Sequence, residues 1–230
     1  MRHSIEMEKL TLGVCYYPEH WDRALWKDDL QRMKQYGIEV IRLAEFSWAL
    51  MEPEEGKYDF SFWDEFLALA AEENMKVVFC TPTATPPAWL SEKYPETLNA
   101  DGDGNLMYHG MRGQHNLTSP KYLEFCEKIT RHMAEHFNKY DCIIGWQLDN
   151  EPAVQFDYNP KAELAFRDFL RAKYNNDIQL LNNAWGTAFW SEAYSSFDEI
   201  TLPKRVQMFM NHHQILDYRR FAASQTNDFL

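Results

Sequence analysis

The stretch IEVIRLAEF, residues 38–46, decides the fold class of this chain. It is a short apolar run rich in β-branched residues, and it follows a glycine, as is typical of a buried strand. Three other stretches have the same character: LTLGVCYY (10–17), KVVFCTPT (76–83) and CIIGWQL (142–148). We expect each of the four to form a strand.

Stretches with helical periodicity separate these predicted strands. Residues 22–36 carry apolar side chains at helical spacing and end at Gly37, and residues 61–74 begin at Ser61, a candidate N-cap. A further helix is predicted over residues 119–138, after a long loop that covers about 84–118. Strands that are apolar on both faces and joined by helices belong to a parallel sheet, because a parallel crossover needs a long connection.

Such a sheet is either an open doubly wound sheet or a barrel. No glycine-rich G-x-G-x-x-G or GxxxxGK[ST] turn follows the first predicted strand, which argues against the nucleotide-binding form of the open sheet. Polar loops follow the strands at their carboxyl ends, where a (β/α)8 barrel places its chemistry. The sequence therefore favours the TIM barrel.

The second half of the chain contains no further convincing strand. Helices are predicted near 160–174, 177–184 and 204–228. A complete (β/α)8 barrel takes about 250 residues and eight strands, so four strands make about half of one. We expect an incomplete α/β TIM barrel, with residues 1–230 as a single portion of it.

Composition limits the classes of partner. The 230 residues are 45% hydrophobic, enough for a core, and the formal net charge of −12 argues against nucleic acid or an anionic membrane surface. The N-terminus has no apolar signal segment, and no apolar run is long enough to span a membrane, so we expect a cytoplasmic protein. The four cysteines lie far apart without metal-ligand spacing, which predicts buried thiols, no metal site and no cofactor.

The stretch IIGWQLDNEP, residues 143–152, ends a predicted strand on Asn150 and Glu151. Cleavage of a glycosidic bond requires a carboxylic acid that protonates the leaving oxygen, and a strand end aims such an acid with little freedom. Asn150 offers a donor and an acceptor to a neighbouring sugar hydroxyl. The alternative is that Asn-Glu-Pro is only a turn that ends the strand. Glu45, which follows the strand that carries Arg42, is a further candidate for the pocket.

Four stretches carry a family resemblance: GVCYYPEHW (13–21), IRLAEFSWALMEPEEGKYDF (41–60), TPTATPPAWL (81–90) and IIGWQLDNEP. In this order they resemble glycoside hydrolase family 42, the β-galactosidases, a family of retaining (β/α)8 glycosidases. The resemblance implies an N-terminal portion of the catalytic domain, which acts on a β-galactoside or small oligosaccharide. It also implies that the complete enzyme is a homotrimer.

The resemblance also implies roles for individual residues. Glu151 would be the acid/base and Asn150 its substrate-binding neighbour, while Arg42 would reach toward the nucleophile and keep it ionised. Arg112 would bind the sugar from its loop, although Gly-Gln follows it where other members often carry Arg-His. Some members bind zinc through cysteines, the first of which would fall near Asn116, so no such site is expected here.

The resemblance places the nucleophilic glutamate beyond Leu230, so the isolated chain is expected to be inactive. Two alternatives stay open. One is another retaining β-glycosidase of the same clan, acting on glucosides, arabinosides or mannosides, because the Asn-Glu pair does not select the sugar. The other is a non-catalytic truncated fragment.

Overall fold

The computed structural model describes residues 10–230, which form two compact units. Unit 1 comprises the chain up to Trp89 together with Cys126–Asn150, and unit 2 comprises Leu90–Phe125 and Glu151–Leu230. Most of the N-terminal stretch in which no signal segment was recognised lies outside the described residues.

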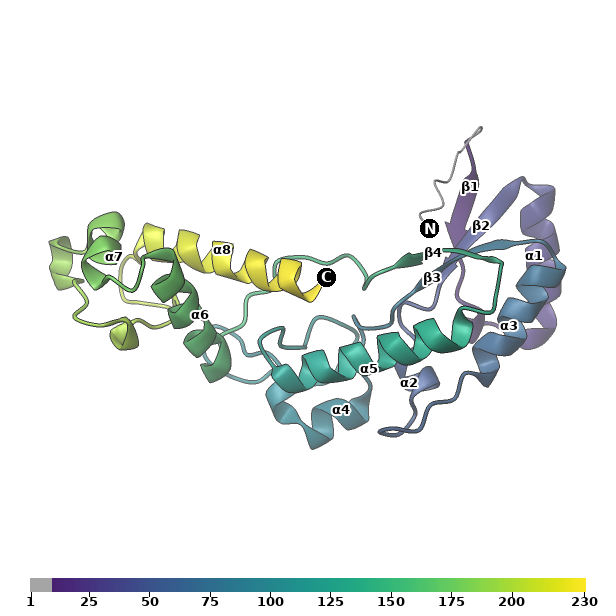
Figure 1. Ribbon diagram of the computed structural model, residues 1–230, viewed down its shortest axis with the longest axis horizontal. Coiled ribbons are helices and arrows are strands. Elements are labelled where there is room, and N and C mark those ends of the chain that lie inside the picture. The colour runs from purple at the N-terminus through teal and green to yellow at the C-terminus, as the bar shows by residue number, and fades with distance from the viewer. Residues whose placement is uncertain (1–9) are drawn as a thin grey trace. The chain divides into compact units, whose positions relative to one another are not determined.

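Unit 1 is built on one parallel sheet, with strand order β1-β2-β3-β4 (Figure 1). All four predicted strands are present, each shorter than its predicted range. Their bounds are Leu12–Cys15 (β1), Ile38–Leu43 (β2), Lys76–Cys80 (β3) and Ile143–Gln147 (β4). Strands consecutive in the chain are neighbours in the sheet, which is the order that a (β/α)8 barrel requires.

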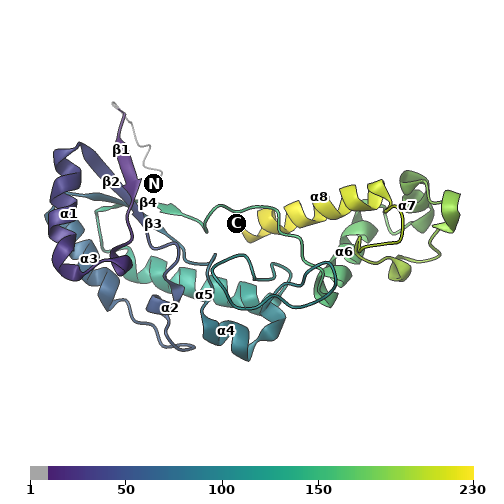
Figure 2. The same ribbon diagram turned by 180° about the vertical axis from the view of Figure 1, so that it is seen from behind.

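Helices connect the strands of unit 1, and α1 and α3 pack beside each other against the sheet (Figure 2). The bounds are Pro18–His20 (η1), Arg23–Gln35 (α1), Trp48–Met51 (α2), Ser61–Glu72 (α3) and Pro120–Phe137 (α5), of which Cys126 onward belongs to unit 1. The prediction of Ser61 as N-cap is wrong. Phe60 occupies that position, and the Ser61 N–H instead donates to Asp59 Oδ1 at 2.9 Å, which places Ser61 inside the first turn.

The two faces of the sheet differ in composition. Paired residues share a face, and Leu43 and Phe79 lie on the face that packs against helices. There Phe79 contacts Trp63, Phe137 and Trp146, with ring centroids 4.9–5.5 Å apart. The opposite face carries the side chain of Arg42, which pairs in register with Val78. Unit 1 therefore has one aromatic, helix-covered face and one face that carries a charge.

Unit 2 is mainly helical, as predicted, but two boundaries were wrong. The expected loop at 84–118 contains helix α4 (Ala88–Lys93) and a 3-10 turn, η2 (Pro95–Thr97). The last helix, α8 (His212–Phe229), starts eight residues later than the predicted 204, because the Asn211 side chain accepts from the His213 and Gln214 N–H groups and caps the helix there.

The helices of unit 2 enclose a core of their own. The remaining elements are α6 (Pro160–Lys173), α7 (Ile178–Trp185), η3 (Phe189–Ser191) and η4 (Phe197–Glu199). The core consists of Ala162, Phe166, Leu170, Leu181, Trp185, Phe197, Ile200, Leu202, Tyr218 and Phe221. Within the described part of the chain, no strand follows β4.

The cysteines are free thiols in the structure. Cys80 and Cys126 are buried, but Cys15 is exposed on β1 and Cys142 is half-buried, so the prediction of four buried thiols is wrong for these two. Over residues 10–230 no helix is long and apolar enough to cross a membrane, and no group of three His, Cys, Asp or Glu is arranged to hold a metal ion.

Candidate active site

Three of the predicted site residues meet at the carboxyl end of the sheet in unit 1. The Arg42 guanidinium lies at the end of β2, and its Nη2 is 2.6 Å from Glu45 Oε1. Its Nη1 donates to Gln147 Oε1 at 2.9 Å and to Asn150 Oδ1 at 3.4 Å. One guanidinium thus links the end of β2 to the end of β4, because its planar fork can serve several acceptors at once.

Glu45 is the buried anion of this cluster, with 0% of its surface exposed. Ala44 before it has φ 84°, a left-handed conformation, and Ser47 donates from both N–H and Oγ to the Ala44 carbonyl. Such a conformation is unfavourable for alanine and persists only where the surrounding structure fixes it. The turn directs the carboxylate inward, where Oε1 also accepts from the Tyr17 hydroxyl at 2.8 Å. The other oxygen, Oε2, is shielded from solvent and makes no hydrogen bond within the described residues.

The protonation states of the groups around Glu45 are fixed by burial and charge. Burial, reinforced by the hydrogen bond to Glu45, raises the pKa of Tyr17 to about 12, so the phenol stays a donor. Burial alone would lower the pKa of Arg42, but the adjacent Glu45 charge raises it overall. Burial, with the Glu45 charge as a second cause, raises the pKa of Cys80 to about 12. Around Glu45, Arg42 is therefore a permanent cation, while the Tyr17 hydroxyl and the Cys80 thiol stay neutral.

The end of β4 is held by a residue that the sequence reasoning missed. Asp149 is buried, and its N–H donates to Thr81 Oγ1 at 2.8 Å while its Oδ2 accepts from Thr83 Oγ1 at 2.6 Å. Its Oδ1 accepts from the Asn150 N–H at 2.6 Å. Asp149 and Glu151 both have positive φ, 55° and 48°. The threonines after β3 thus fix the turn that carries Asn150.

In unit 2 the structure pairs the other two predicted residues. Arg112 Nη2 lies 2.9 Å from Glu151 Oε2, and both side chains reach solvent, with 49% and 71% of their surface exposed. Gly113, which follows the arginine, has φ 82°, a conformation that favours glycine. Asn116, where the family's first zinc ligand would fall, is buried, and its Oδ1 accepts from the Thr118 N–H at 2.7 Å, so this position does not suit a metal.

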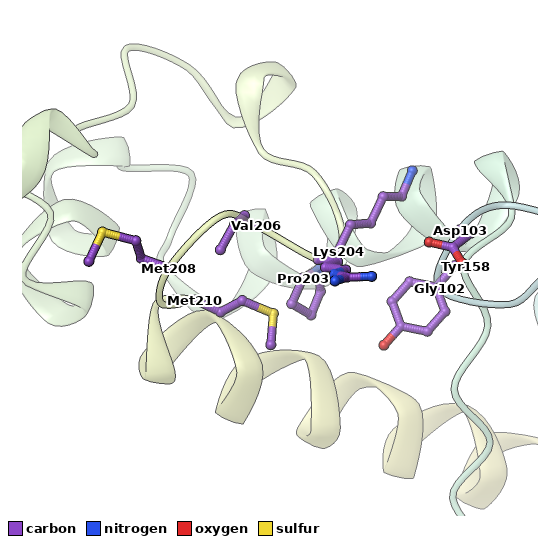
Figure 3. Close-up of a pocket in the computed structure, with 9 residues that line it drawn as sticks. Gly102, Asp103, Tyr158, Pro203, Lys204, Val206, Met208 and Met210 are labelled. Atoms are coloured by element: carbon purple, nitrogen blue, oxygen red, sulfur yellow. The ribbon is translucent and has the colours of Figure 1, made fainter.

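Two pockets in unit 2 contain none of the predicted site residues. One, of about 300 Å³, is lined by Gly102, Asp103, Tyr158, Pro203, Lys204, Arg205, Val206, Met208 and Met210 (Figure 3). The other, of about 570 Å³, lies around Trp185, Trp190 and Phe209. The convergent polar groups lie instead at the strand ends of unit 1 and on the Arg112 loop of unit 2, and each group is a candidate within its own unit.

Comparison with known proteins identifies the family. The family model Glyco_hydro_42, described as beta-galactosidase, matches residues 15–230. The chain is 44% identical over 221 residues to beta-galactosidase BgaA of a Thermus species, and 39% identical over 223 residues to beta-galactosidase Bga of Halorubrum lacusprofundi. These alignments cover 95% and 96% of the chain but 34% and 32% of the relatives. The chain thus spans about a third of the length of the curated relatives it matches.

Solved structures agree in fold. The beta-galactosidase of the psychrophilic Marinomonas ef1 superposes with a TM-score of 0.90 at 38% identity, covering 96% of this chain and 34% of that one. The Halorubrum lacusprofundi enzyme gives 0.91 at 39% identity, covering 96% and 33%. The predicted fold class, an incomplete TIM barrel, is confirmed by such neighbours together with the parallel sheet. The chain belongs to glycoside hydrolase family 42, the β-galactosidases.

Proposed function

We propose that this chain supplies the acid/base part of a retaining β-galactosidase, with Glu151 as the acid/base. The observation that carries the proposal is the order of groups after β4. Asn150 is fixed against Arg42 by the Asp149 turn, and Glu151 comes next in the chain with a solvent-accessible carboxyl group. A strand end that presents an amide and then a carboxyl group suits an acid that acts beside a bound sugar.

The proposed mechanism is a double displacement. In the first step Glu151 gives its proton to the glycosidic oxygen while a second carboxylate attacks the anomeric carbon and forms a glycosyl-enzyme. In the second step Glu151, now ionised, takes a proton from water, and this water displaces the carboxylate. Each of the two displacements inverts the configuration of the anomeric carbon, so the product keeps the β configuration of the substrate.

The other candidate residues have supporting roles in this proposal. The Asn150 Oδ1 faces Arg42, and its Nδ2 makes no hydrogen bond within the described residues, so this group can donate to a sugar hydroxyl. Glu45 holds Arg42 through their ion pair, and Arg42 would keep the second carboxylate ionised through its charge. Arg112, paired with Glu151 in the structure, would bind the sugar.

We further propose that the second carboxylate comes from outside these 230 residues, which form an N-terminal portion of the catalytic domain. The chain holds four parallel strands where the barrel has eight, and it spans about a third of its curated relatives. On this proposal the 230-residue chain hydrolyses no galactoside by itself. A homotrimeric complete enzyme follows from the family resemblance and stays a prediction, as does the cytoplasmic location expected from the sequence.

The test compares the 230-residue chain with the full-length enzyme that contains it, using a nitrophenyl β-galactoside. We expect turnover only by the longer chain, and loss of turnover of unactivated galactosides in its Glu151→Gln variant. Azide needs no base to attack a glycosyl-enzyme, so azide should restore turnover of Glu151→Gln with an activated substrate and give a β-galactosyl azide.

The matched control is Glu127→Gln, which removes an equally exposed glutamate that pairs with Arg131. This variant should keep full activity. Activity of the short chain that depends on Glu151 would show that the nucleophile lies within these residues. An unaffected Glu151→Gln variant of the longer enzyme would remove Glu151 from the acid/base role.

A further inference from the structure

We infer that Asn99 is a positioning residue that fixes the Arg112 loop and, through Arg112, the acid/base Glu151. The inference rests on the proposed function, since it names the group that holds one of its residues in place. It concerns only unit 2, which contains Asn99, the loop and Glu151.

Asn99 closes the loop that carries Arg112 at both ends. Its carbonyl accepts from the Met107 N–H at 2.8 Å, at the start of the loop. Its N–H donates to the Gln114 carbonyl at 2.8 Å, at the end of the loop. Its side-chain Nδ2 donates to the Gly113 carbonyl at 2.9 Å, directly after Arg112. Backbone and side chain of one residue therefore fasten residues 107–114 at their base.

The bridges on either side of Asn99 make this base rigid. Leu98 forms an isolated antiparallel bridge with His115, and Ala100 forms another with Leu106, so Asn99 lies between two bridges. The Ala100 N–H also donates to the buried Asp157 carboxylate at 2.9 Å. Asn99 itself is buried, with 5% of its surface exposed, so its amide has little freedom to choose other partners.

The tip of the loop has little else to hold it. Tyr108 and Met111 expose 90% and 91% of their surface and so add little packing. The Arg112–Glu151 ion pair is exposed, and one exposed ion pair is too weak to hold the whole loop in place. The position of Arg112 is therefore decided at the base, where Asn99 makes three hydrogen bonds of 2.8–2.9 Å.

The chemistry at this position requires an amide. The Gly113 carbonyl needs a donor, which a carboxylate or an aliphatic side chain cannot supply. Gly113 has φ 82°, so the chain reverses direction where the Asn99 Nδ2 reaches it. Asn99→Ala would leave the Gly113 carbonyl without its side-chain donor and release the end of the loop nearest Arg112.

The experiment uses the full-length enzyme that contains this chain, with kcat/KM measured on two galactosides. One has a dinitrophenolate leaving group, which departs without protonation, and the other has an alkyl or sugar leaving group, which needs the acid. Glu151→Gln should lower kcat/KM on the second substrate by about 100-fold or more and affect the first much less. Asn99→Ala should show the same preference with a smaller loss, about tenfold on the second substrate.

A double-mutant cycle shows whether Asn99 acts through Arg112. In an Arg112→Ala background, Asn99→Ala should change kcat/KM by less than about twofold, because the group that it positions is already gone.

Gly113→Ala is a second variant that disturbs the same loop. It strains the backbone at φ 82° but keeps the Asn99 side chain, and it should give the same leaving-group preference. The matched control is Asn182→Ala, which removes a similarly buried amide that donates to the Tyr194 carbonyl at 2.8 Å and should affect both substrates equally and little.

Leaving-group dependence in Asn99→Ala and Gly113→Ala, together with non-additivity with Arg112→Ala, supports the inference. The inference is overturned if Glu151→Gln shows leaving-group dependence but Asn99→Ala lowers kcat/KM equally on both substrates. It is also overturned if the effects of Asn99→Ala and Arg112→Ala are fully additive. If Glu151→Gln itself lacks leaving-group dependence, the proposed function fails, and this inference fails with it.

Discussion

The Arg42 guanidinium lies 2.6 Å from a Glu45 carboxylate that is completely shielded from water. A buried charge is tolerated only while its partners stay in place, because the unpaired ion would have to be desolvated without compensation. The Tyr17 hydroxyl shares the same carboxylate oxygen, so the end of β2 and the segment after β1 both depend on Glu45. The first prediction follows from this dependence.

Glu45→Gln should destabilise unit 1 by about 3 kcal/mol, because it leaves the Arg42 charge without its partner. Urea unfolding of the chain measures this change. Glu65→Gln breaks an exposed pair with Arg23 in the same unit and should cost less than about 1 kcal/mol. If the two substitutions lowered the unfolding free energy equally, the buried pair would contribute no more to stability than the exposed pair.

Thr81→Val should weaken the turn that carries Asn150. It keeps the volume of the side chain but removes the hydroxyl that accepts from the Asp149 N–H, and a buried unpaired N–H costs about 1–3 kcal/mol. In the full-length enzyme we expect kcat/KM to fall by more than the loss of folded protein explains. Thr187→Val, a buried threonine that donates to Asn182 in unit 2, is the control, and an equal fall in its activity would refute a local role for Thr81.

Asp157 should make the stability of unit 2 depend on pH. Burial raises its pKa to about 6, so the folded chain binds this proton more tightly than the unfolded chain. The tighter proton binding therefore stabilises the folded chain fully below the unfolded pKa of about 4, and this stabilisation is lost as pH rises to about 6. The unfolding free energy should therefore fall by up to about 3 kcal/mol relative to Asp157→Asn across this range.

The Asp157 measurement is the difference in unfolding free energy between the two proteins at pH 4, 5, 6 and 7. A constant difference would show that Asp157 does not titrate in this window. The difference isolates Asp157 because carboxyl groups with lowered pKa, such as Asp217, titrate identically in both proteins and with the opposite sign.

The outer strands of the sheet should make the 230-residue chain associate. Apolar side chains on β1 and β4 are exposed at Leu12, Ile144 and Trp146, and each outer strand has unpaired backbone groups along its free edge. We expect concentration-dependent association in sedimentation, reduced by Ile144→Lys. Leu164→Lys, which changes an exposed leucine on a helix of unit 2, should not reduce it. A monodisperse monomer at high concentration would contradict the prediction.

The fold could be predicted because its signals are local. Each strand is a short apolar run, and each long helix has its own periodicity. The errors occur where a single contact decides the outcome. Asn211 starts the last helix by capping it, and α4 begins at Ala88, directly after two prolines, inside the range predicted as a loop.

The candidate site could be predicted only in part, for a similar reason. Arg42 and Glu45 were each predicted as site residues, but their ion pair was not, because residues three apart at a strand end do not normally share a face. The partners of Asp149 lie 66 and 68 residues away in the chain, and the partner of the Asn99 side chain is a backbone carbonyl. Neither relationship leaves a pattern in a single sequence, because nothing in the composition of a loop tells which distant hydroxyl or carbonyl it will meet.

The hydroxyl groups that fix Asp149 come from the segment after β3, which precedes β4 in the chain. A ribosome therefore releases both threonines before it releases the aspartate that they hold. The turn with Asn150 can assemble during synthesis, as soon as β4 adds to the sheet and before any later part of a polypeptide exists. The hydrogen bonds that fix this turn thus need no residue beyond Asn150.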